Sequence, residues 1–407
     1  MDLNPAPAAA RQRWLSYVAA IVLAHSVAAQ PPPAITEFPL VLNSQASLIT
    51  SGPDGNLWFT EFNSNRVARM TVSGVLSEFR VSTTLRGLGS ITTGPDNNLW
   101  FIESVANQIG RITVSGDITE FPIGTGNGKP TAITTGPDGN LWFTEVDGNK
   151  IGRITPEGAI TEFQLQTPTG RPQGITAGSD GNLWFTEVTG NKIAYITPEG
   201  TNMIVEFPIT SSDPGPASIT AGPDGNLWFT ELRGNRIGRA SIDGVISEFP
   251  IPSNSQPTEI AAGPDGNLWF TEFSTNQVGR ITPDGVITEY PIPTARSGPN
   301  GITGGPDGNL WVTEFFGDNL ARIEPPAAQP TPTPPAGTPT ATPRGGPCVG
   351  DCNGDGQVTA DELITMVTIA LGDASVAACT AGDADGSGTI EITEIVAAVS
   401  NALSGCV

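Results

Sequence analysis

A short apolar segment, usually Leu-Trp-Phe-Thr-Glu, recurs along the chain directly after the polar turn sequence Gly-Pro-Asp-Gly-Asn. Its tryptophans are Trp58, Trp100, Trp142, Trp184, Trp228, Trp269 and Trp311, so successive copies are 41–44 residues apart. A constant period of about 40–45 residues, with turn glycines and strand aromatics, is typical of β-propellers, in which each repeat forms one blade. The pattern therefore predicts an all-β fold, a seven-bladed propeller of four-stranded antiparallel blades.

The third repeat shows how the pattern divides into strands. Its four predicted strands, from the inside of the ring outwards, cover residues 131–135, 141–145, 149–154 and 160–163. Gly139 supplies the positive φ that the first hairpin turn needs. Because blades stack face to face, we expect the second strand to be buried on both faces. Its Trp and Phe should fill the space between neighbouring blades.

The two ends of the repeat array complement each other. The outer-strand phrase Ile-Thr-Glu-Phe-Pro appears at residues 35–39, before the first complete inner strand, and the seventh repeat lacks it. We therefore expect an N-terminal strand at 35–41 to complete the last blade, which removes the open edges of the ring. The propeller then spans residues 30–324.

Residues 1–29 have the composition of a secretory signal peptide. Arg11 and Arg13 precede an apolar run at 14–24, and small residues at 27–29 offer a cleavage site. A membrane anchor is the alternative, but the run is shorter than the roughly 20 residues of a spanning helix. We expect a secreted protein, periplasmic or extracellular, with no membrane segment after cleavage.

Charge and histidine content restrict the chemistry. The formal net charge is −22, which disfavours binding to nucleic acid or to anionic lipid and favours cations. The only histidine, His25, lies in the signal segment. Acid–base chemistry in the mature protein would therefore depend on carboxylates, lysine or tyrosine with shifted pKa values.

The region after the propeller contains a linker and a small module. Residues 325–347 are rich in proline and threonine and predict an extended spacer. Residues 348–407 carry two copies of the EF-hand loop pattern, each followed by an apolar helix, which extends from 363 to 371 in the first copy. The predicted calcium ligands are Asp351, Asn353, Asp355, Gln357, Thr359 and Glu362 in the first loop, and Asp383, Asp385, Ser387, Thr389, Glu391 and Glu394 in the second.

The arrangement of these loops resembles the dockerin type of duplicated calcium module, which implies a protein partner. All four cysteines lie in this module: Cys348, Cys352, Cys379 and Cys406. In an exported protein they predict two disulfides with three alternative pairings.

The propeller phrases, together with Ile-Gly-Arg-Ile-Thr-Pro-Glu/Asp-Gly and Ile-Thr-Glu-Phe-Pro, resemble the virginiamycin B lyase (streptogramin B lyase) family over about residues 35–323. The resemblance implies enzymes that open a cyclic depsipeptide by elimination across its ester bond. They use a histidine base and magnesium held by glutamates near the mouth of the central channel.

The histidine positions of that family, two residues before the inner-strand isoleucine, are Ser47, Gly89, Thr131, Gln173, Ala217, Thr258 and Asn300 in this chain. None of these residues is a base at neutral pH. The position of one metal-binding glutamate, two residues earlier, holds Gly215, Gln256 and Gly298 in the last three complete inner strands.

The other metal position, the glutamate that ends the second strand, is present in every repeat: Glu61, Glu103, Glu145, Glu187, Glu231, Glu272 and Glu314. Seven carboxylates around a channel need cations or donors. Magnesium or calcium is one candidate. Repeated basic residues eight positions later are another, namely Arg69, Arg111, Arg153, Arg239, Arg280 and Arg322. Repeat scaffolding without a metal is the third interpretation.

Three functions remain open. The first is an exported, monomeric binding or scaffold propeller without lyase catalysis, whose ligand is a small molecule, a glycan or a protein. The second is a metal-dependent carbon–oxygen lyase or lactonase that uses carboxylates at the channel mouth. The third is a streptogramin lyase with a substituted base such as Tyr195 or a lysine.

Overall fold

The structure of the protein is a computed structural model that describes residues 32–83, 87–198, 204–326 and parts of 349–401. The chain divides into two compact units, residues 1–328 and 329–407, which are described separately. The predicted signal segment, the predicted linker after residue 326, and Cys348 and Cys406 lie outside the described residues.

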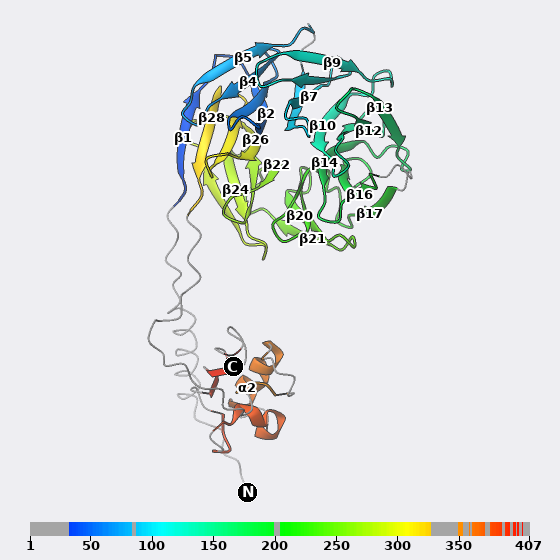
Figure 1. Cartoon of the computed structure of the whole chain (residues 1–407). Helices are drawn as coiled ribbons and strands as arrows, with labels where there is room; N and C mark the ends of the chain where they lie inside the picture. Colours follow the sequence, from blue (N-terminus) through cyan, green and yellow to red (C-terminus); the bar gives the residue numbers. More distant parts are fainter. Residues whose placement is uncertain are drawn as a thin grey trace. The chain divides into compact units, whose positions relative to one another are not determined.

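The first unit contains seven four-stranded antiparallel sheets around a common centre (Figure 1). The innermost strands are β2 (Ala46–Ser51), β6 (Leu88–Thr93), β10 (Pro130–Thr135), β14 (Pro172–Ala177), β18 (Pro216–Ala221), β22 (Pro257–Ala262) and β26 (Pro299–Gly304). The second strands are β3 (Leu57–Glu61), β7 (Leu99–Glu103), β11 (Leu141–Glu145), β15 (Leu183–Glu187), β19 (Leu227–Glu231), β23 (Leu268–Glu272) and β27 (Leu310–Glu314).

The two remaining strands of each blade complete the sheet towards the outside. The third strands are β4 (Arg66–Met70), β8 (Gln108–Ile112), β12 (Lys150–Ile154), β16 (Lys192–Ile196), β20 (Arg236–Ala240), β24 (Gln277–Ile281) and β28 (Asn319–Glu324). The outer strands are β5 (Leu76–Arg80), β9 (Ile118–Pro122), β13 (Ile160–Gln164), β17 (Ile204–Pro208), β21 (Ile246–Pro250), β25 (Ile287–Pro291) and β1 (Ala34–Pro39). The predicted propeller is confirmed.

The N-terminal strand closes the ring as expected. Strand β1 pairs antiparallel with β28, from Ala34 opposite Glu324 to Pro39 opposite Asn319. The seventh blade therefore combines the first strand of the propeller with the last three, and its outer edge is supplied by the opposite end of the repeat array.

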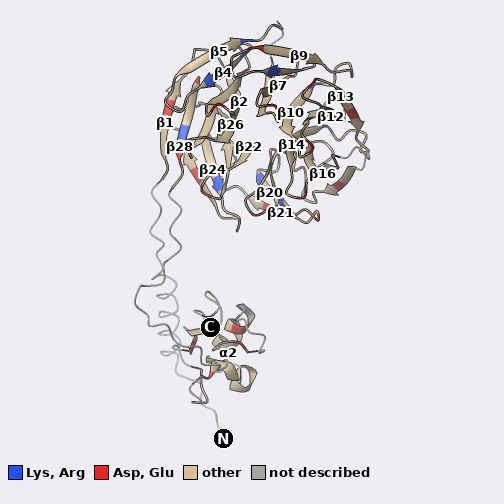
Figure 2. Ribbon diagram, viewed as in Figure 1, with Lys and Arg blue, Asp and Glu red and all other residues tan. Residues whose placement is uncertain are grey.

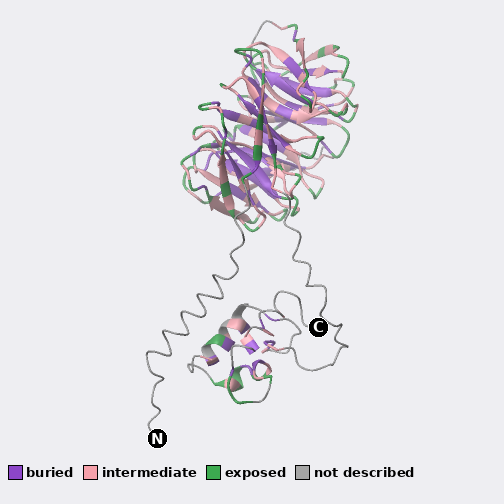
Figure 3. Cartoon of the chain, turned by 90° about the vertical axis from the view of Figure 1, so that its left-hand side faces the viewer, coloured by how far each residue is buried: buried purple, intermediate pink, exposed green. Residues whose placement is uncertain are grey.

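The hydrophobic core lies between the blades rather than within one. All seven repeat tryptophans are fully buried, and each packs against the leucine and the aromatic or valine of the next blade's second strand. In one interface Trp142 packs on Leu183 and Phe185. Figure 3 shows this burial along the strands and the exposed turns around them. The prediction of an interblade aromatic core is confirmed.

The second unit has a small helical core. Helix α2 (Ala360–Ala370) begins before the expected Leu363, so its first turn includes the last residues of the first predicted calcium loop. Two short 3₁₀ helices, η1 (Val376–Ala378) and η2 (Thr380–Gly382), precede the second loop. Met366 and Ile390 are buried in this core together with Cys379.

Among the residues that the structure describes, no helix has the length and the apolar composition needed to cross a membrane.

Candidate functional site

Every inner strand contains a β-bulge close to its start. In β10, Pro130 is opposite Glu145 and Ile133 is opposite Phe143, so Thr131 and Ala132 lack partners in the register. The same irregularity occurs in all seven inner strands. Bulges redirect side chains and are frequent at functional sites. Here the two bulged residues of several blades line a cavity in the central channel.

A threonine of the second strand holds the bulges in place and connects neighbouring blades. In blade five, Thr230 Oγ1 accepts a hydrogen bond from the Ser218 N–H at 3.0 Å and donates to the Thr258 carbonyl of the next blade at 3.0 Å. Equivalent threonines donate to the next blade in six repeats. The second repeat has Ile102 at this position. The threonine of the repeated phrase is therefore a link between blades.

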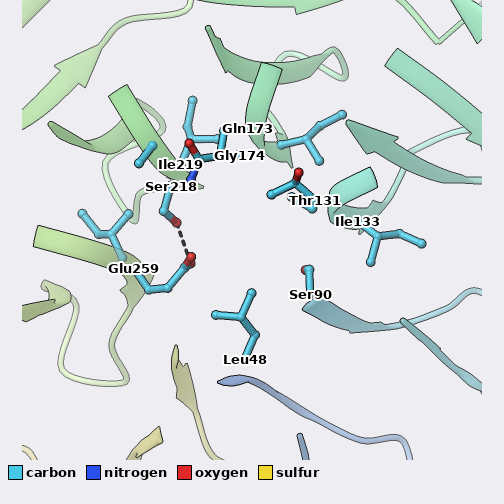
Figure 4. Close-up of a pocket in the computed structure, with 13 residues that line it drawn as sticks. Leu48, Ser90, Thr131, Ile133, Gln173, Gly174, Ser218, Ile219 and Glu259 are labelled. Atoms are coloured by element: carbon cyan, nitrogen blue, oxygen red, sulfur yellow. Dashed lines mark hydrogen bonds between the residues drawn. The ribbon is translucent and has the colours of Figure 1, made fainter. Parts of the chain in front are cut away.

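The channel cavity has a volume of about 130 Å³ and is lined by bulged residues and inner-strand isoleucines. Glu259 extends into it, and its Oε2 accepts a hydrogen bond of 2.7 Å from Ser218 Oγ (Figure 4). Burial raises the pKa of Glu259 to about 7, although the Ser218 hydrogen bond acts in the opposite direction. A carboxyl group that titrates near neutrality inside a cavity is a candidate functional group.

Glu259 is a candidate functional residue that the repeat pattern of the sequence did not indicate. It stands one residue before the inner-strand isoleucine, where the other blades have Leu48, Ser90, Ala132, Gly174, Ser218 and Gly301. None of the seven inner strands, all of which are described, carries a second charged residue. The available signal was this break in the seven-fold symmetry, one position after the predicted histidine site.

The positions at which the resemblance places the family's histidines coincide with the first bulged residue of each blade. Thr131, Gln173 and Ala217 line the cavity directly. The position of the family's earlier metal glutamate, at Gly215, Gln256 and Gly298, has positive φ values of 54–63°. The inner strands therefore place these positions near the channel, but with side chains that neither abstract a proton nor carry a charge.

The strand-end glutamates do not lie in the channel cavity, although a metal site formed by them at the channel mouth would need accessible carboxylates there. All seven are buried, and none is among the residues that line the cavity. Each interacts electrostatically with the glutamate of its own blade's outer strand, which for Glu145 is Glu162. The outer-strand partners are Glu78, Glu120, Glu162, Glu206, Glu248, Glu289 and Glu37. These contacts form seven separate carboxyl pairs rather than one ring.

Burial makes these carboxyl groups weaker acids than ordinary glutamates. It raises the pKa values of Glu61, Glu103, Glu187 and Glu314 to about 7, and those of Glu145 and Glu231 to about 8. The pKa of Glu272 is also raised. Neither carboxylate oxygen of Glu145 receives a hydrogen bond from a donor. A protonated Glu145 satisfies this geometry, because it donates to the Glu162 carboxylate.

The expected pairing of these glutamates with arginines eight residues later is wrong. Because the second and third strands are antiparallel, Glu145 is opposite Lys150, whereas Arg153 is opposite Trp142. The Arg153 guanidinium lies over the Trp142 ring at 5.6 Å and pairs with Asp138 at the turn. Basic residues five positions after the glutamate approach the carboxyl pairs instead, namely Arg66, Lys150, Lys192 and Arg236. Figure 2 shows charged residues of both signs distributed around the ring.

Within the described part of the chain, no three His, Cys, Asp or Glu side chains are grouped closely enough to hold a metal ion. The channel metal therefore stays a prediction without a described ligand set. Only Glu259 brings a carboxylate into the cavity.

A cluster of four phenylalanines, two of them exposed and two half-buried, lies at the end of the ring where the inner strands begin. We call Phe62, Phe273, Phe315 and Phe316 the entrance cluster; neighbouring ring centroids in it are 5.1–6.5 Å apart. Phe62 is 41% and Phe316 60% exposed. The Phe315 N–H donates to the Gly298 carbonyl, which fixes the cluster beside the bulge of the seventh blade. Exposed aromatic groups of this kind mark binding surfaces.

In the second unit, several predicted calcium ligands are described. Asp383, at the first position of the second loop, accepts hydrogen bonds of 2.9 Å from the N–H groups of Ser387 and Gly388. Glu394 is buried, and its Oε1 accepts a hydrogen bond from the Ala384 N–H. The first and last acidic residues of this loop therefore both accept hydrogen bonds from its backbone N–H groups. Asp351 and Glu362 of the first loop are buried as well.

The other predicted ligands, Asn353, Asp355, Gln357, Thr359, Asp385 and Glu391, lie outside the described residues or side chains. Among the described cysteines, Cys352 in the first loop and Cys379 before the second form a disulfide, which agrees with one of the three predicted pairings.

Comparison with known proteins agrees with this architecture. The model of the virginiamycin B lyase family matches residues 11–213 and 201–329. The chain belongs to the virginiamycin B lyase family. It is 38% identical to the virginiamycin B lyase of Staphylococcus aureus, with a TM-score of 0.69, and the match covers 72% of this chain and 99% of that one.

Two further solved structures are also 38% identical in sequence to this chain. A streptogramin B lyase has a TM-score of 0.69 with 72% and 97% coverage, and a catalytically inactive variant of the S. aureus enzyme with quinupristin has a TM-score of 0.68 with 72% and 99% coverage. The WD40 propeller of Doa1, at 13% identity and a TM-score of 0.59, shares the fold alone. The search of curated proteins found no match.

Proposed function

We propose that this family member is an exported ligand-binding propeller that does not open streptogramin esters. The observation that carries the proposal is the chemistry of the bulged positions. Elimination needs a base beside the substrate, and the first bulged residues are Ser47, Gly89, Thr131, Gln173, Ala217, Thr258 and Asn300. The only ionisable group in the cavity is Glu259, which is the second residue of its bulge.

The buried carboxyl pairs support the same conclusion. Magnesium binding by a strand-end glutamate such as Glu314 requires an ionised carboxylate with an open coordination position. Glu314 is buried, burial raises its pKa to about 7, and its Oε2 accepts a hydrogen bond from Asn319. In every blade the same pair recurs, as expected of scaffold residues rather than of a site specific to one blade.

The entrance cluster supports retained binding. Its exposed rings at the channel end form an apolar surface on which the hydrophobic part of a ligand can pack, and aromatic side chains bury large areas on binding. We therefore propose a ligand with an apolar body that binds over blades six, seven and one.

Quinupristin, found with a variant of the S. aureus enzyme, is the probe for this proposal. We expect the chain to return the cyclic compound intact in the presence of magnesium, while the S. aureus enzyme linearises it. Formation of linear product that is lost in Glu314→Gln would overturn the proposal and restore a metal-dependent lyase.

We also propose that the C-terminal module binds calcium and that the protein is exported. The carboxylates of Asp383 and Glu394 are oxygen donors of the type that calcium prefers. The Cys352–Cys379 disulfide is typical of oxidising compartments. Calorimetric titration of the full chain should detect calcium binding that weakens in Glu394→Gln. Equal binding by both proteins would contradict the assignment of this loop.

A further inference from the structure

We infer that the channel cavity at Glu259 binds a primary ammonium group. This inference deepens the proposed function, since it specifies the polar chemistry of the ligand whose apolar part the entrance cluster would hold. The carboxylate of Glu259 has no basic partner on the inner strands. No lysine or arginine lies on any of the seven inner strands, so no group of the channel wall neutralises the Glu259 carboxylate. A carboxylate removed from water needs a positive partner or a proton.

The position of Glu259 is fixed by the two bulges around it. Its own N–H donates to Thr271 Oγ1 at 3.0 Å, and its carboxylate accepts the Ser218 hydroxyl. Thr230 in turn holds the Ser218 N–H and the Thr258 carbonyl, so it fixes the spacing of the adjacent bulges. The carboxylate is therefore held in one orientation on the cavity wall before a ligand arrives, which lowers the ordering cost of binding.

The rest of the lining matches an ammonium group on a short alkyl chain. Ser90, Thr131 and Gln173 face the same cavity and contribute oxygen acceptors (Figure 4). An ammonium group donates three hydrogen bonds, which one carboxylate and two neutral oxygens can accept. The remaining walls are apolar, formed by Leu48 and by the inner-strand isoleucines, and they suit a methylene chain.

Size and ligand count favour this group over other occupants. The cavity has a volume of about 130 Å³, which is smaller than the roughly 300 Å³ or more that whole drug-sized ligands need. A divalent cation would need several anionic ligands, and Glu259 is the only carboxylate among the residues that line the cavity. The excess of acidic residues, with a net charge of −22, attracts cationic ligands to the protein.

The test is calorimetric titration of the full chain with n-butylammonium chloride at about pH 8, where a group of pKa near 7 is ionised. The matched neutral compound is n-butanol. We expect butylammonium to bind and butanol not to bind. Glu259→Gln keeps the shape and the capacity to accept from Ser218, and it should weaken butylammonium binding by at least about tenfold, the worth of one charge-assisted hydrogen bond.

Glu272→Gln in the same blade is the control, because it removes a buried carboxyl that does not line the cavity. It should leave butylammonium affinity unchanged. Thermal unfolding of each variant shows that any loss of binding occurs in folded protein. Thr230→Val should also weaken binding while Glu259 is retained, as expected of a positioning residue.

Three results would overturn the inference: no heat with butylammonium, equal affinity in wild type and Glu259→Gln, or equal binding of butanol. Titrations with potassium and calcium ions form the second arm, and Glu259-dependent binding of a metal ion without butylammonium binding would also overturn it. Quinupristin turnover is a separate readout. Linear product would refute the non-lyase function, whereas failure of butylammonium to bind refutes only the assignment of this cavity.

Discussion

Replacing Glu145 with glutamine should stabilise the propeller at alkaline pH. Glu145 is buried with both carboxylate oxygens lacking donors, and burial raises its pKa to about 8. A raised folded-state pKa means that the native protein binds a proton that the unfolded chain releases. The stability from this proton is complete below the unfolded-state pKa of about 4.5 and is lost as pH rises towards the folded-state value.

The magnitude follows from the linkage relation. One proton changes the unfolding free energy by about 1.4 kcal/mol per pH unit, so full linkage over the interval from about pH 5 to about pH 8 would amount to about 4 kcal/mol. Residual solvent screening and the nearby Lys150, which lies 3.5 Å from Glu162, reduce the expected effect to about 1–2 kcal/mol. Glutamine replaces the protonated acid with a neutral donor and acceptor, and so removes this pH dependence.

The assay is urea unfolding at about pH 5 and pH 8, followed by tryptophan fluorescence, because every repeat tryptophan is in the propeller core. We expect Glu145→Gln to match wild type at the lower pH and to exceed it at the higher. Glu157→Gln, on an exposed turn of the same blade, makes the same charge change and should show no such difference. If Glu145→Gln is no more stable than the wild type at pH 8, the carboxyl-pair interpretation is refuted.

Two other perturbations test the architecture. Thr230→Val should lower the free energy of unfolding by about 1–3 kcal/mol, because the isosteric change leaves the Ser218 N–H and the Thr258 carbonyl without their partner. Thr161→Val on the exposed outer strand is the control. Equal unfolding midpoints for the two variants would contradict a link between blades. Deletion of residues 30–40 removes β1 and exposes the edge of β28, so the propeller should unfold at a lower temperature; an unchanged melting temperature would show that the closure carries little stability.

Much of the fold follows from the repeat, because each local signal has a direct structural consequence. The turn glycines and the burial of the second strand predict the blades, and the displaced outer-strand phrase predicts the pairing of β1 with β28. These are short-range patterns with a fixed period, and the sequence displays them seven times.

The site was less accessible from the sequence, for two physical reasons. The bulges shift the inner-strand register by a local irregularity, so alternation did not indicate that Glu259 would line the cavity. The partners of Glu145 depend on cross-strand register: Lys150 is directly opposite, whereas Arg153 is opposite Trp142 near the other end of the strand. A spacing of eight residues along the chain did not reveal which end of the hairpin the arginine occupies.

We propose that this propeller keeps the family fold without the family's ester-opening chemistry. The most direct test is a mass-spectrometric time course of quinupristin with the purified chain and magnesium, alongside the S. aureus enzyme at equal concentration. We expect the cyclic compound to be recovered unchanged from the chain while the S. aureus enzyme consumes it. Accumulation of the linear product with the wild-type chain would refute a propeller without ester-opening activity.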